Sequence, residues 1–142
     1  YRLIPRAIMA TMTKKKLILD GGGTSLRSFI HIKDVCEATF EVLTNGKEGE
    51  TYHISSDKVI SVRECVEEIL QATKKKFDDA VTLGPERPGK DAIYMLSSQK
   101  IRDELNWKEK VEFSTGISQV IAWVSDNLEI FEELGLEYEH KT

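Results

Sequence analysis

The chain has 142 residues, a length that suits one ordinary domain with a sizeable buried core. With 40% hydrophobic and 31% charged residues, its composition is typical of a globular protein. The formal net charge of -4 provides no overall basic field, so we expect neither nucleic acid nor an anionic membrane as a partner. No apolar run approaches the ~20 residues that are needed to span a bilayer.

The cysteines and histidines argue against a disulfide framework and against a zinc site. Cys36 and Cys65 lie far apart, each inside a helical apolar pattern, and we expect both to be buried free thiols. Such thiols fit a reducing cytoplasm, which is the predicted location. His31, His53 and His140 are scattered without a pair at metal-ligand spacing, so no metal site is expected.

The N-terminal part of the chain predicts one helix and two strands. Apolar residues recur at a spacing of four over Arg2–Met12, which predicts a helix, and Pro5 is tolerated in its first turn. A short strand is predicted over Leu17–Leu19, and a second one, rich in β-branched and aromatic residues, over Ser28–Ile32. The glycines between them, Gly21–Gly23, are interpreted as the tip of a hairpin or of a loop.

The next segments continue the alternation of helix and strand. A helix is predicted to begin at Asp34 and to end at Asn45 and Gly46, where the glycine would supply the left-handed residue after the helix. A third strand is predicted over Gly49–Ser55. Ser61–Glu64 matches a capping box, which predicts the start of another helix.

The C-terminal part predicts a fourth strand, a loop and two helices. The strand covers Ala80–Gly84, and the loop covers Glu86–Asp91. A serine, Ser97 or Ser98, caps a short helix, and a last long helix runs from about residue 115 through Leu134. Because strands alternate with helices along the chain, the predicted fold class is α/β.

The segment "GGGTSLRSFIH" raises the question of what its only charged side chain, Arg27, does. Two interpretations stay open: a hairpin that carries a solvated arginine, or an arginine that is held in place to bind an anion. No G-x-G-x-x-G precedes a helix in this segment, so the dinucleotide-binding motif is absent here.

A second arginine, Arg87, lies in the segment "ERPGKD" between a proline and a glycine. The proline pushes Arg87 toward an extended conformation, and Gly89 permits a turn that a side chain would resist. A guanidinium matches phosphate oxygens two at a time, so Arg87 is either a ligand contact or a charge in a surface loop. Lys90 or Asp91 would orient the guanidinium or contact neighbouring hydroxyl groups.

The order of these motifs resembles a known family. The matching segments are "RLIPRAI", "RSFIHIKDVCEATFEVL", "GETYHIS", "RPGKDAIYMLSSQKIRDELNW" and "AWVSDN", which together cover essentially the whole chain. They resemble the C-terminal half of the extended short-chain dehydrogenase/reductases that act on nucleotide sugars. Within this family of NAD-dependent epimerases and dehydratases, the resemblance is above all to the dTDP-glucose 4,6-dehydratases.

The resemblance implies the C-terminal part of an extended Rossmann-type fold together with its small substrate-binding domain. Residues 1–30 would begin the substrate-binding lid, and residues 31–56 would supply strands and a helix that return to the Rossmann sheet. Residues 57–142 would form the C-terminal substrate-binding domain.

The resemblance also implies substrate contacts. Arg27 and Arg87 would contact the nucleotide diphosphate. Leu3 would lie against the sugar nucleotide near the start of the lid, and Leu19 and Asp20 would lie beside the base or the ribose.

Two further positions, His53 and Lys90, are assigned to the substrate by the same resemblance. Lys90 follows the R-P-G motif, where the dehydratases often have histidine. His53 stands where they usually have asparagine, and Asp20 stands where an aromatic residue is frequent. These departures leave the identity of the nucleotide open.

The family's G-x-x-G-x-x-G motif and its Tyr-x-x-x-Lys pair do not occur in this sequence. With the first residue being Tyr1, this leads us to expect a C-terminal fragment that holds neither catalytic nor cofactor-binding residues and is inactive alone. The expected function is nucleotide-sugar binding within an NAD- or NADP-dependent 4,6-dehydratase or epimerase, a lyase or isomerase of carbohydrate biosynthesis. An N-terminal Rossmann half would bind most of the cofactor, and the whole protein is expected to be a homodimer. The alternative is a non-catalytic binding or interaction module that lacks the redox half.

Overall fold

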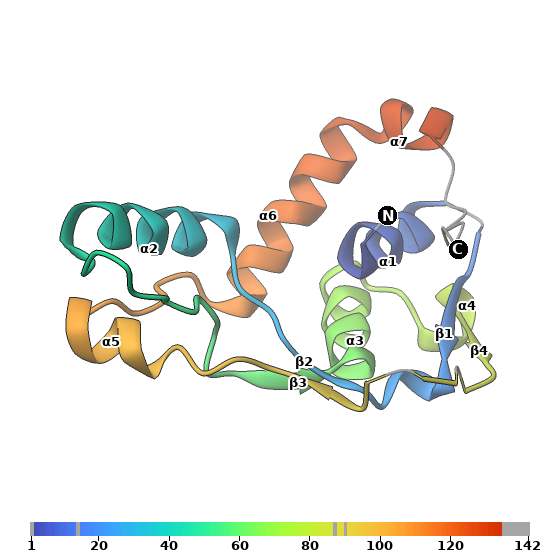
Figure 1. The fold of residues 1–142 in the computed structure, drawn as a ribbon. Helices are drawn as coiled ribbons and strands as arrows, with labels where there is room; N and C mark the ends of the chain where they lie inside the picture. Colours follow the sequence, from blue (N-terminus) through green and yellow to red (C-terminus); the bar gives the residue numbers. More distant parts are fainter. Residues whose placement is uncertain (1, 14, 87, 90, 135–142) are drawn as a thin grey trace. The chain divides into compact units, whose positions relative to one another are not determined.

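Helices and strands alternate along the chain, as the sequence predicts (Figure 1). The structure is a computed structural model, and it describes residues 2–13, 15–86, 88–89 and 91–134.

The chain divides into two compact units. The first unit takes residues 1–24, 63–90 and 117–142, and the second takes residues 25–62 and 91–116. The division at residues 30 and 56 that the family resemblance implies stays a prediction.

The first unit contains a parallel strand pair and most of the helices. Its elements are α1 (Leu3–Met12), β1 (Leu17–Asp20), the 3₁₀ turn η1 (Gly21–Gly23), α4 (Phe77–Ala80), β4 (Val81–Gly84), α7 (Leu128–Leu134) and most of two helices, α3 (Val62–Ala72) and α6 (Phe113–Asp126). The first residue of α3 and residues 113–116 of α6 belong to the second unit. The strands β1 and β4 run parallel, with Leu17 opposite Val81 and Asp20 opposite Gly84. The predicted strands over 17–19 and 80–84 are therefore confirmed.

The core of the first unit is built from the apolar faces that the helical spacing predicts. Its buried apolar side chains come from α1, β1, α3, α4, β4 and α6: Ala7, Ile8, Met9, Ala10, Leu17, Leu19, Cys65, Val66, Ile69, Leu70, Ala80, Val81, Ile117 and Val124. Helix α3 buries its side chains along one face, as the apolar periodicity predicts, whereas α1 buries five consecutive residues, 7–11, and is therefore covered on all sides there.

The glycine run is a left-handed turn. Gly21, Gly22 and Gly23 have φ values of +57°, +66° and +73°, a region that only glycine adopts readily. A Cβ on Gly23 would lie 2.9 Å from both the backbone nitrogen of Arg63 and a methyl carbon of Leu19. The turn is a loop and not a hairpin, because β1 pairs with β4 while the following strand belongs to another sheet.

The second unit contains a three-stranded sheet and two helices. Its elements are β2 (Leu26–Ser28), α2 (Ile32–Asn45), β3 (Val59–Ser61), β5 (Ile93–Tyr94) and α5 (Gln99–Leu105). The strand order is β3-β2-β5, with β3 antiparallel and β5 parallel to the central β2. Ala38 of α2, Ile101 of α5 and the buried Trp107 form the core, which Val42 and Leu105 extend.

The strand predicted over Ser28–Ile32 is shorter than expected. It ends at Ser28, because His31 is the N-cap of α2 and Ile32 already belongs to that helix. The Nδ1 atom of His31 accepts a hydrogen bond of 3.2 Å from the backbone N–H of Lys33, a group that has no partner inside the helix.

The strand predicted over Gly49–Ser55 is wrong. Residues 51–56 belong to neither sheet. Side chains of α5 and its N-cap, instead of a neighbouring strand, satisfy backbone carbonyls of this segment. Lys100 Nζ donates to the carbonyl of Thr51 at 3.2 Å, and Ser98 Oγ donates to the carbonyl of Ser55 at 2.9 Å.

Two helix ends also differ from the prediction. Gly46 has φ of −68° and is not left-handed, but a Cβ there would lie 2.4 Å from the carbonyl oxygen of Val42, so close approach explains the glycine. The last long helix divides into α6 and α7 at Asn127, whose Nδ2 donates to the carbonyl of Trp123 at 2.8 Å.

The two cysteines have different surroundings. Cys65 is fully buried, as expected, whereas Cys36 is exposed on α2, so the prediction for Cys36 is wrong. The side of α2 that faces the core carries Ala38 and Val42, and Cys36 lies on another side of the helix.

Candidate functional site

In the first unit, the carboxyl ends of β1 and β4 lie at one edge of the parallel pair. Asp20 ends β1, and Gly84 opposite it has no side chain, so Oδ1 of Asp20 lies 2.8 Å from where a Cβ would be. The backbone N–H of Gly21 donates to the carbonyl of Pro85 at 3.1 Å. The chain after both strands is thereby fastened at the edge where open α/β sheets bind ligands.

The predicted substrate residues of the first unit differ in exposure. Leu19 is buried, so its side chain belongs to the core and only its backbone is available to a ligand. Asp20 and Leu3 are half-buried, and Leu3 is the first residue of α1. Arg87 and Lys90 lie outside the described residues.

In the second unit, Arg27 lies in the central strand β2, opposite Ile60 of β3 and Tyr94 of β5. Its Nη1 donates to the carbonyl of Leu26 at 2.7 Å, and its Nη2 donates to the carbonyl of Asp91 at 3.0 Å. A guanidinium has five N–H donors, so these two bonds leave three without a partner among the described residues.

Arg27 also has no carboxylate within ion-pair distance in the described part of the chain, although it is half-buried. Arg102, also half-buried, provides the contrast, since its guanidinium lies 3.3 Å from Asp57 and 2.5 Å from Glu109. It also stacks on Trp107 at 5.2 Å. The charge of Arg102 is therefore balanced within the fold, whereas Arg27 has no such carboxylate among the described residues.

His53 is exposed in the segment that joins α2 to β3, and it makes no hydrogen bond to another described residue. The structure brings Arg27 together with Asp91, the last residue of the "ERPGKD" segment. It does not bring His53 into contact with either of them.

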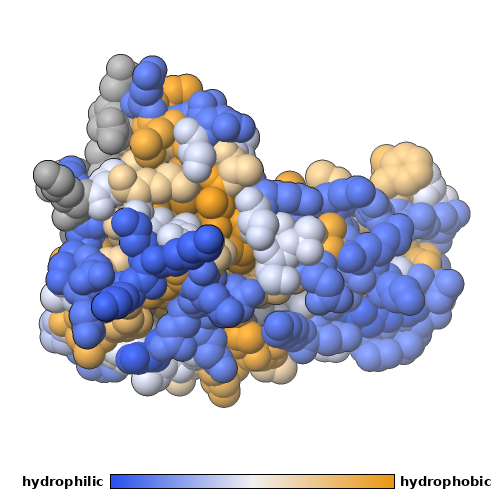
Figure 2. All heavy atoms as spheres, turned by 180° about the vertical axis from the view of Figure 1, so that it is seen from behind, coloured by the Kyte–Doolittle hydropathy of each residue, from blue (hydrophilic) through white to orange (hydrophobic). Residues whose placement is uncertain are grey.

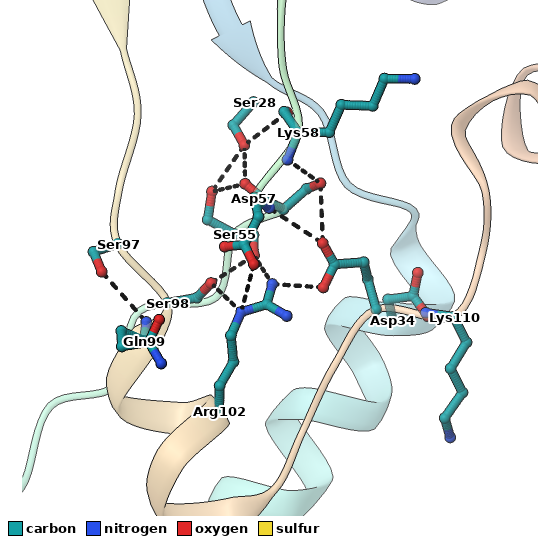
Figure 3. A network of polar contacts seen from close by, with 12 residues as sticks. Ser28, Asp34, Ser55, Asp57, Lys58, Ser97, Ser98, Gln99, Arg102 and Lys110 are labelled. Atoms are coloured by element: carbon teal, nitrogen blue, oxygen red, sulfur yellow. Dashed lines mark hydrogen bonds and ion pairs between the residues drawn. The ribbon is translucent and has the colours of Figure 1, made fainter.

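A buried polar network beside β2 was missed by the sequence analysis (Figure 3). Ser28 donates to the carbonyl of Ser56 at 2.5 Å, and the buried Ser55 donates to Ser28 Oγ at 3.1 Å. Ser98 and Arg102 join the network from α5 and its N-cap. The available signal was the spacing of four between Ser98 and Arg102, which places both on one side of α5.

Asp34 has a structural role at the start of α2. Its side chain is 1% exposed, and its two carboxylate oxygens accept from the backbone N–H groups of Lys110 at 3.0 Å and Val111 at 3.1 Å. Asp34 therefore fastens the loop before α6 to α2.

An open hollow of about 620 Å³ lies beside α2, lined among others by Phe40, Leu105 and Trp107. None of the predicted substrate residues that the structure describes lines it. In the described part of the chain, no three of His, Cys, Asp and Glu gather where they could hold a metal ion, and no helix there is long and apolar enough to cross a membrane.

The fold and its comparison with known structures define the class as an extended short-chain dehydrogenase/reductase of Rossmann type, so the predicted α/β fold class is confirmed. The chain belongs to the GDP-mannose 4,6 dehydratase family, whose model matches residues 1–120.

Individual relatives agree with this assignment. The dTDP-glucose 4,6-dehydratase of Streptomyces niveus is 34% identical over 133 residues, which cover 94% of this chain and 39% of that protein. The dTDP-glucose 4,6-dehydratase DesIV of Streptomyces venezuelae, with NAD and TDP bound, is 29% identical with a TM-score of 0.87, covering 94% of this chain and 41% of that one. The Bordetella bronchiseptica enzyme WbmF, in complex with NAD+ and UDP, is 27% identical with a TM-score of 0.77, covering 94% and 39%. The chain spans 37% to 39% of the length of the first curated relatives that it matches.

Proposed function

We propose that these 142 residues are the nucleotide-sugar binding portion of an NAD(P)-dependent 4,6-dehydratase or epimerase. The observation that carries the proposal is Arg27, a half-buried cation with free N–H donors and no carboxylate partner among the described residues. A diphosphate supplies the charge and the acceptor oxygens that this guanidinium lacks. The TDP and UDP in DesIV and WbmF support a nucleoside diphosphate as the ligand.

Arg27 and Arg87 are the proposed diphosphate contacts. Leu19 and Asp20 are proposed beside the base or ribose, and Leu3 against the sugar nucleotide. His53 and Lys90 complete the proposed substrate contacts.

The described residues do not fit the cofactor. A dinucleotide pyrophosphate is bound where a glycine-rich turn opens a helix, but the turn Gly21–Gly23 leads through residues 24–25 into strand β2. We therefore infer that NAD or NADP is bound mainly by a Rossmann portion of the whole protein outside these 142 residues, which match only 37% to 39% of the length of these relatives. The 142 residues alone would then lack the redox reaction, and the whole protein would be a cytoplasmic homodimer of carbohydrate biosynthesis.

Titration with TDP and with UDP tests the proposal. Arg27→Ala removes charge-assisted hydrogen bonds worth about 1.5–3 kcal/mol, so we expect the Kd for the preferred nucleotide to rise about tenfold to hundredfold. Arg63→Ala is the matched control, because it removes an arginine that already pairs with Glu67 at 2.8 Å. Equal affinity of the wild type and Arg27→Ala for both nucleotides would show that Arg27 does not contribute to nucleotide binding. Binding without NAD-dependent turnover in the whole protein would favour a non-catalytic module.

A further inference from the structure

Ser28 follows Arg27 in β2, and the two side chains lie on opposite faces of the strand. On its face, Ser28 Oγ donates to the carbonyl of Ser56 at 2.5 Å and accepts from Ser55 Oγ at 3.1 Å. The side chain of Ser28 therefore ties the backbone that carries Arg27 to residues 55–58, which we call the strap.

The strap is fastened on its other side as well. The Ser98 hydroxyl donates to the carbonyl of Ser55 at 2.9 Å, and Arg102 Nη2 donates to the same oxygen at 3.3 Å. Glu109 Oε1 accepts from Ser56 Oγ and from the Asp57 N–H, both at 3.2 Å. Figure 3 shows Ser28 on one side of the strap and Ser98 and Arg102 on the other.

The strap leads directly into β3, whose Val59 lies opposite Ser28 and whose Ile60 lies opposite Arg27. These strands have three residues each, so few ladder hydrogen bonds hold their register. A slip by one residue moves a side chain to the other face of a sheet. The strap network therefore supplies the register that the short ladder by itself specifies weakly.

The network adds this rigidity without neutralising Arg27. Its carboxylates, Asp57 and Glu109, pair with Arg102. The contact between β2 and the strap is made by neutral groups, the hydroxyl of Ser28 and the hydroxyl and carbonyl groups of the strap. Arg27 thus gains a fixed position while its charge stays available to a ligand.

We propose that Ser28 and the strap form a positioning network that fixes the face and the depth at which Arg27 meets the substrate diphosphate. This inference rests on the proposed function. Ser28 and Ser98 are proposed as positioning residues, because their hydroxyls donate to carbonyls of the strap.

The test is a double-mutant cycle measured by TDP titration, or by UDP titration where UDP is the preferred nucleotide. We expect Ser28→Ala to raise the Kd about fivefold to tenfold, and Ser28→Thr, which keeps the hydroxyl, to stay near the wild type. Ser98→Ala probes the other side of the strap, with a smaller rise of about threefold expected. In the Arg27→Ala background, both alanine substitutions are expected to change the Kd less than about 1.5-fold, because neighbouring groups that act through one contact are not additive.

Ser125→Ala is the matched control, since its hydroxyl lies on α6 and, among the described residues, donates to Met12 Sδ at 3.8 Å. Circular dichroism checks that each variant is folded. Wild-type affinity in both Ser28→Ala and Ser98→Ala overturns the positioning network and leaves the proposed function standing. An equal loss with and without Arg27 overturns it too, because the serines would then act independently of that arginine. Wild-type affinity in Arg27→Ala overturns both proposals.

Discussion

Two arginines of the second unit show that the partners of a side chain decide its role. Arg102 is paired with two carboxylates and stacked on Trp107, so it holds the fold together. Arg27 is bound by backbone carbonyls alone, which fix the guanidinium without cancelling its charge. The sequence analysis singled out Arg27 because it follows the glycines, but it missed Arg102. Asp57 is far from Arg102 in the chain, and Glu109 shares no sequence pattern with it, so neither ion pair could be predicted from the sequence.

The cysteines give a prediction about thiol reactivity. Burial raises the pKa of Cys65 to about 12, with the nearby Glu68 charge adding to the effect, so little reactive thiolate forms at neutral pH. Cys36 is exposed. Titration of the native chain with a disulfide reagent is expected to modify one thiol quickly and the second only in denaturant. Fast modification that persists in Cys36→Ser would contradict this assignment.

Glu109 gives a prediction about acid stability. Burial raises the pKa of this carboxyl, but hydrogen bonds from its own backbone N–H, from Arg102 and from the Asp57 N–H outweigh burial and hold the pKa below its ordinary value. A carboxylate with a lowered folded-state pKa stabilises the fold above its ordinary pKa, and this contribution is lost as the pH falls through the folded-state value.

The melting temperature is therefore expected to drop between about pH 5 and pH 3. This drop is expected to be shallower in Glu109→Gln, which is already destabilised at pH 7. Glu48→Gln, at an exposed position, is the control and is expected to keep the wild-type slope. A slope that is identical in Glu109→Gln would show that the ion pair does not contribute.

At the scale of elements, two glycines of the turn after β1 allow the cost of backbone strain to be distinguished from the cost of steric crowding. Gly22 has φ of +66° and open space around it, whereas Gly23 has φ of +73° and the Arg63 backbone nitrogen 2.9 Å from where a Cβ would lie. Gly22→Ala is expected to lower the free energy of unfolding by about 1 kcal/mol, the cost of the left-handed conformation. Gly23→Ala is expected to cost about 1–3 kcal/mol more, because crowding is added. Urea unfolding measures both, and equal losses would contradict the predicted crowding.

Elements with a strong apolar period could be predicted from the sequence, and elements that depend on distant partners could not. The apolar periodicity located both α1 and α3, although only α3 buries a single face and α1 is covered on all sides over residues 7–11. Residues 49–55 carry a pattern typical of a strand, but side chains of α5 and its N-cap occupy their carbonyls. His31 caps α2 by accepting a hydrogen bond from the backbone N–H of Lys33. This cap was not predicted, because His31 stands within an apolar run that is typical of a strand.

At the scale of the whole chain, a large amount of apolar surface is exposed, and Figure 2 shows such apolar patches on one face. Among the residues that the structure describes, the exposed large apolar side chains are Ile18, Ile32, Phe40, Leu43, Leu83, Ile93, Tyr94, Met95, Leu96, Trp123 and Ile130. Four of them are consecutive, from Ile93 to Leu96, and begin in β5 at the edge of its sheet. Apolar surface and strand edges of this kind favour association.

We therefore expect the isolated 142-residue chain to self-associate and to bind no NAD. Light scattering across a concentration series and an NAD titration measure both properties. A monomer with a cooperative melt at all concentrations would show that the exposed apolar residues need no partner.

The path of the main chain has a consequence for protein engineering. The chain passes between its two compact units at residues 24–25, 62–63, 90–91 and 116–117. Neither unit is a continuous stretch, so no single truncation yields either one whole. A protease that cuts between residues 62 and 63 leaves each unit composed of two separate peptides, which only noncovalent contacts hold together. In a chimaera with a relative, the exchanged piece should therefore contain all four of these connections. The crossover points would then lie before residue 24 and after residue 117.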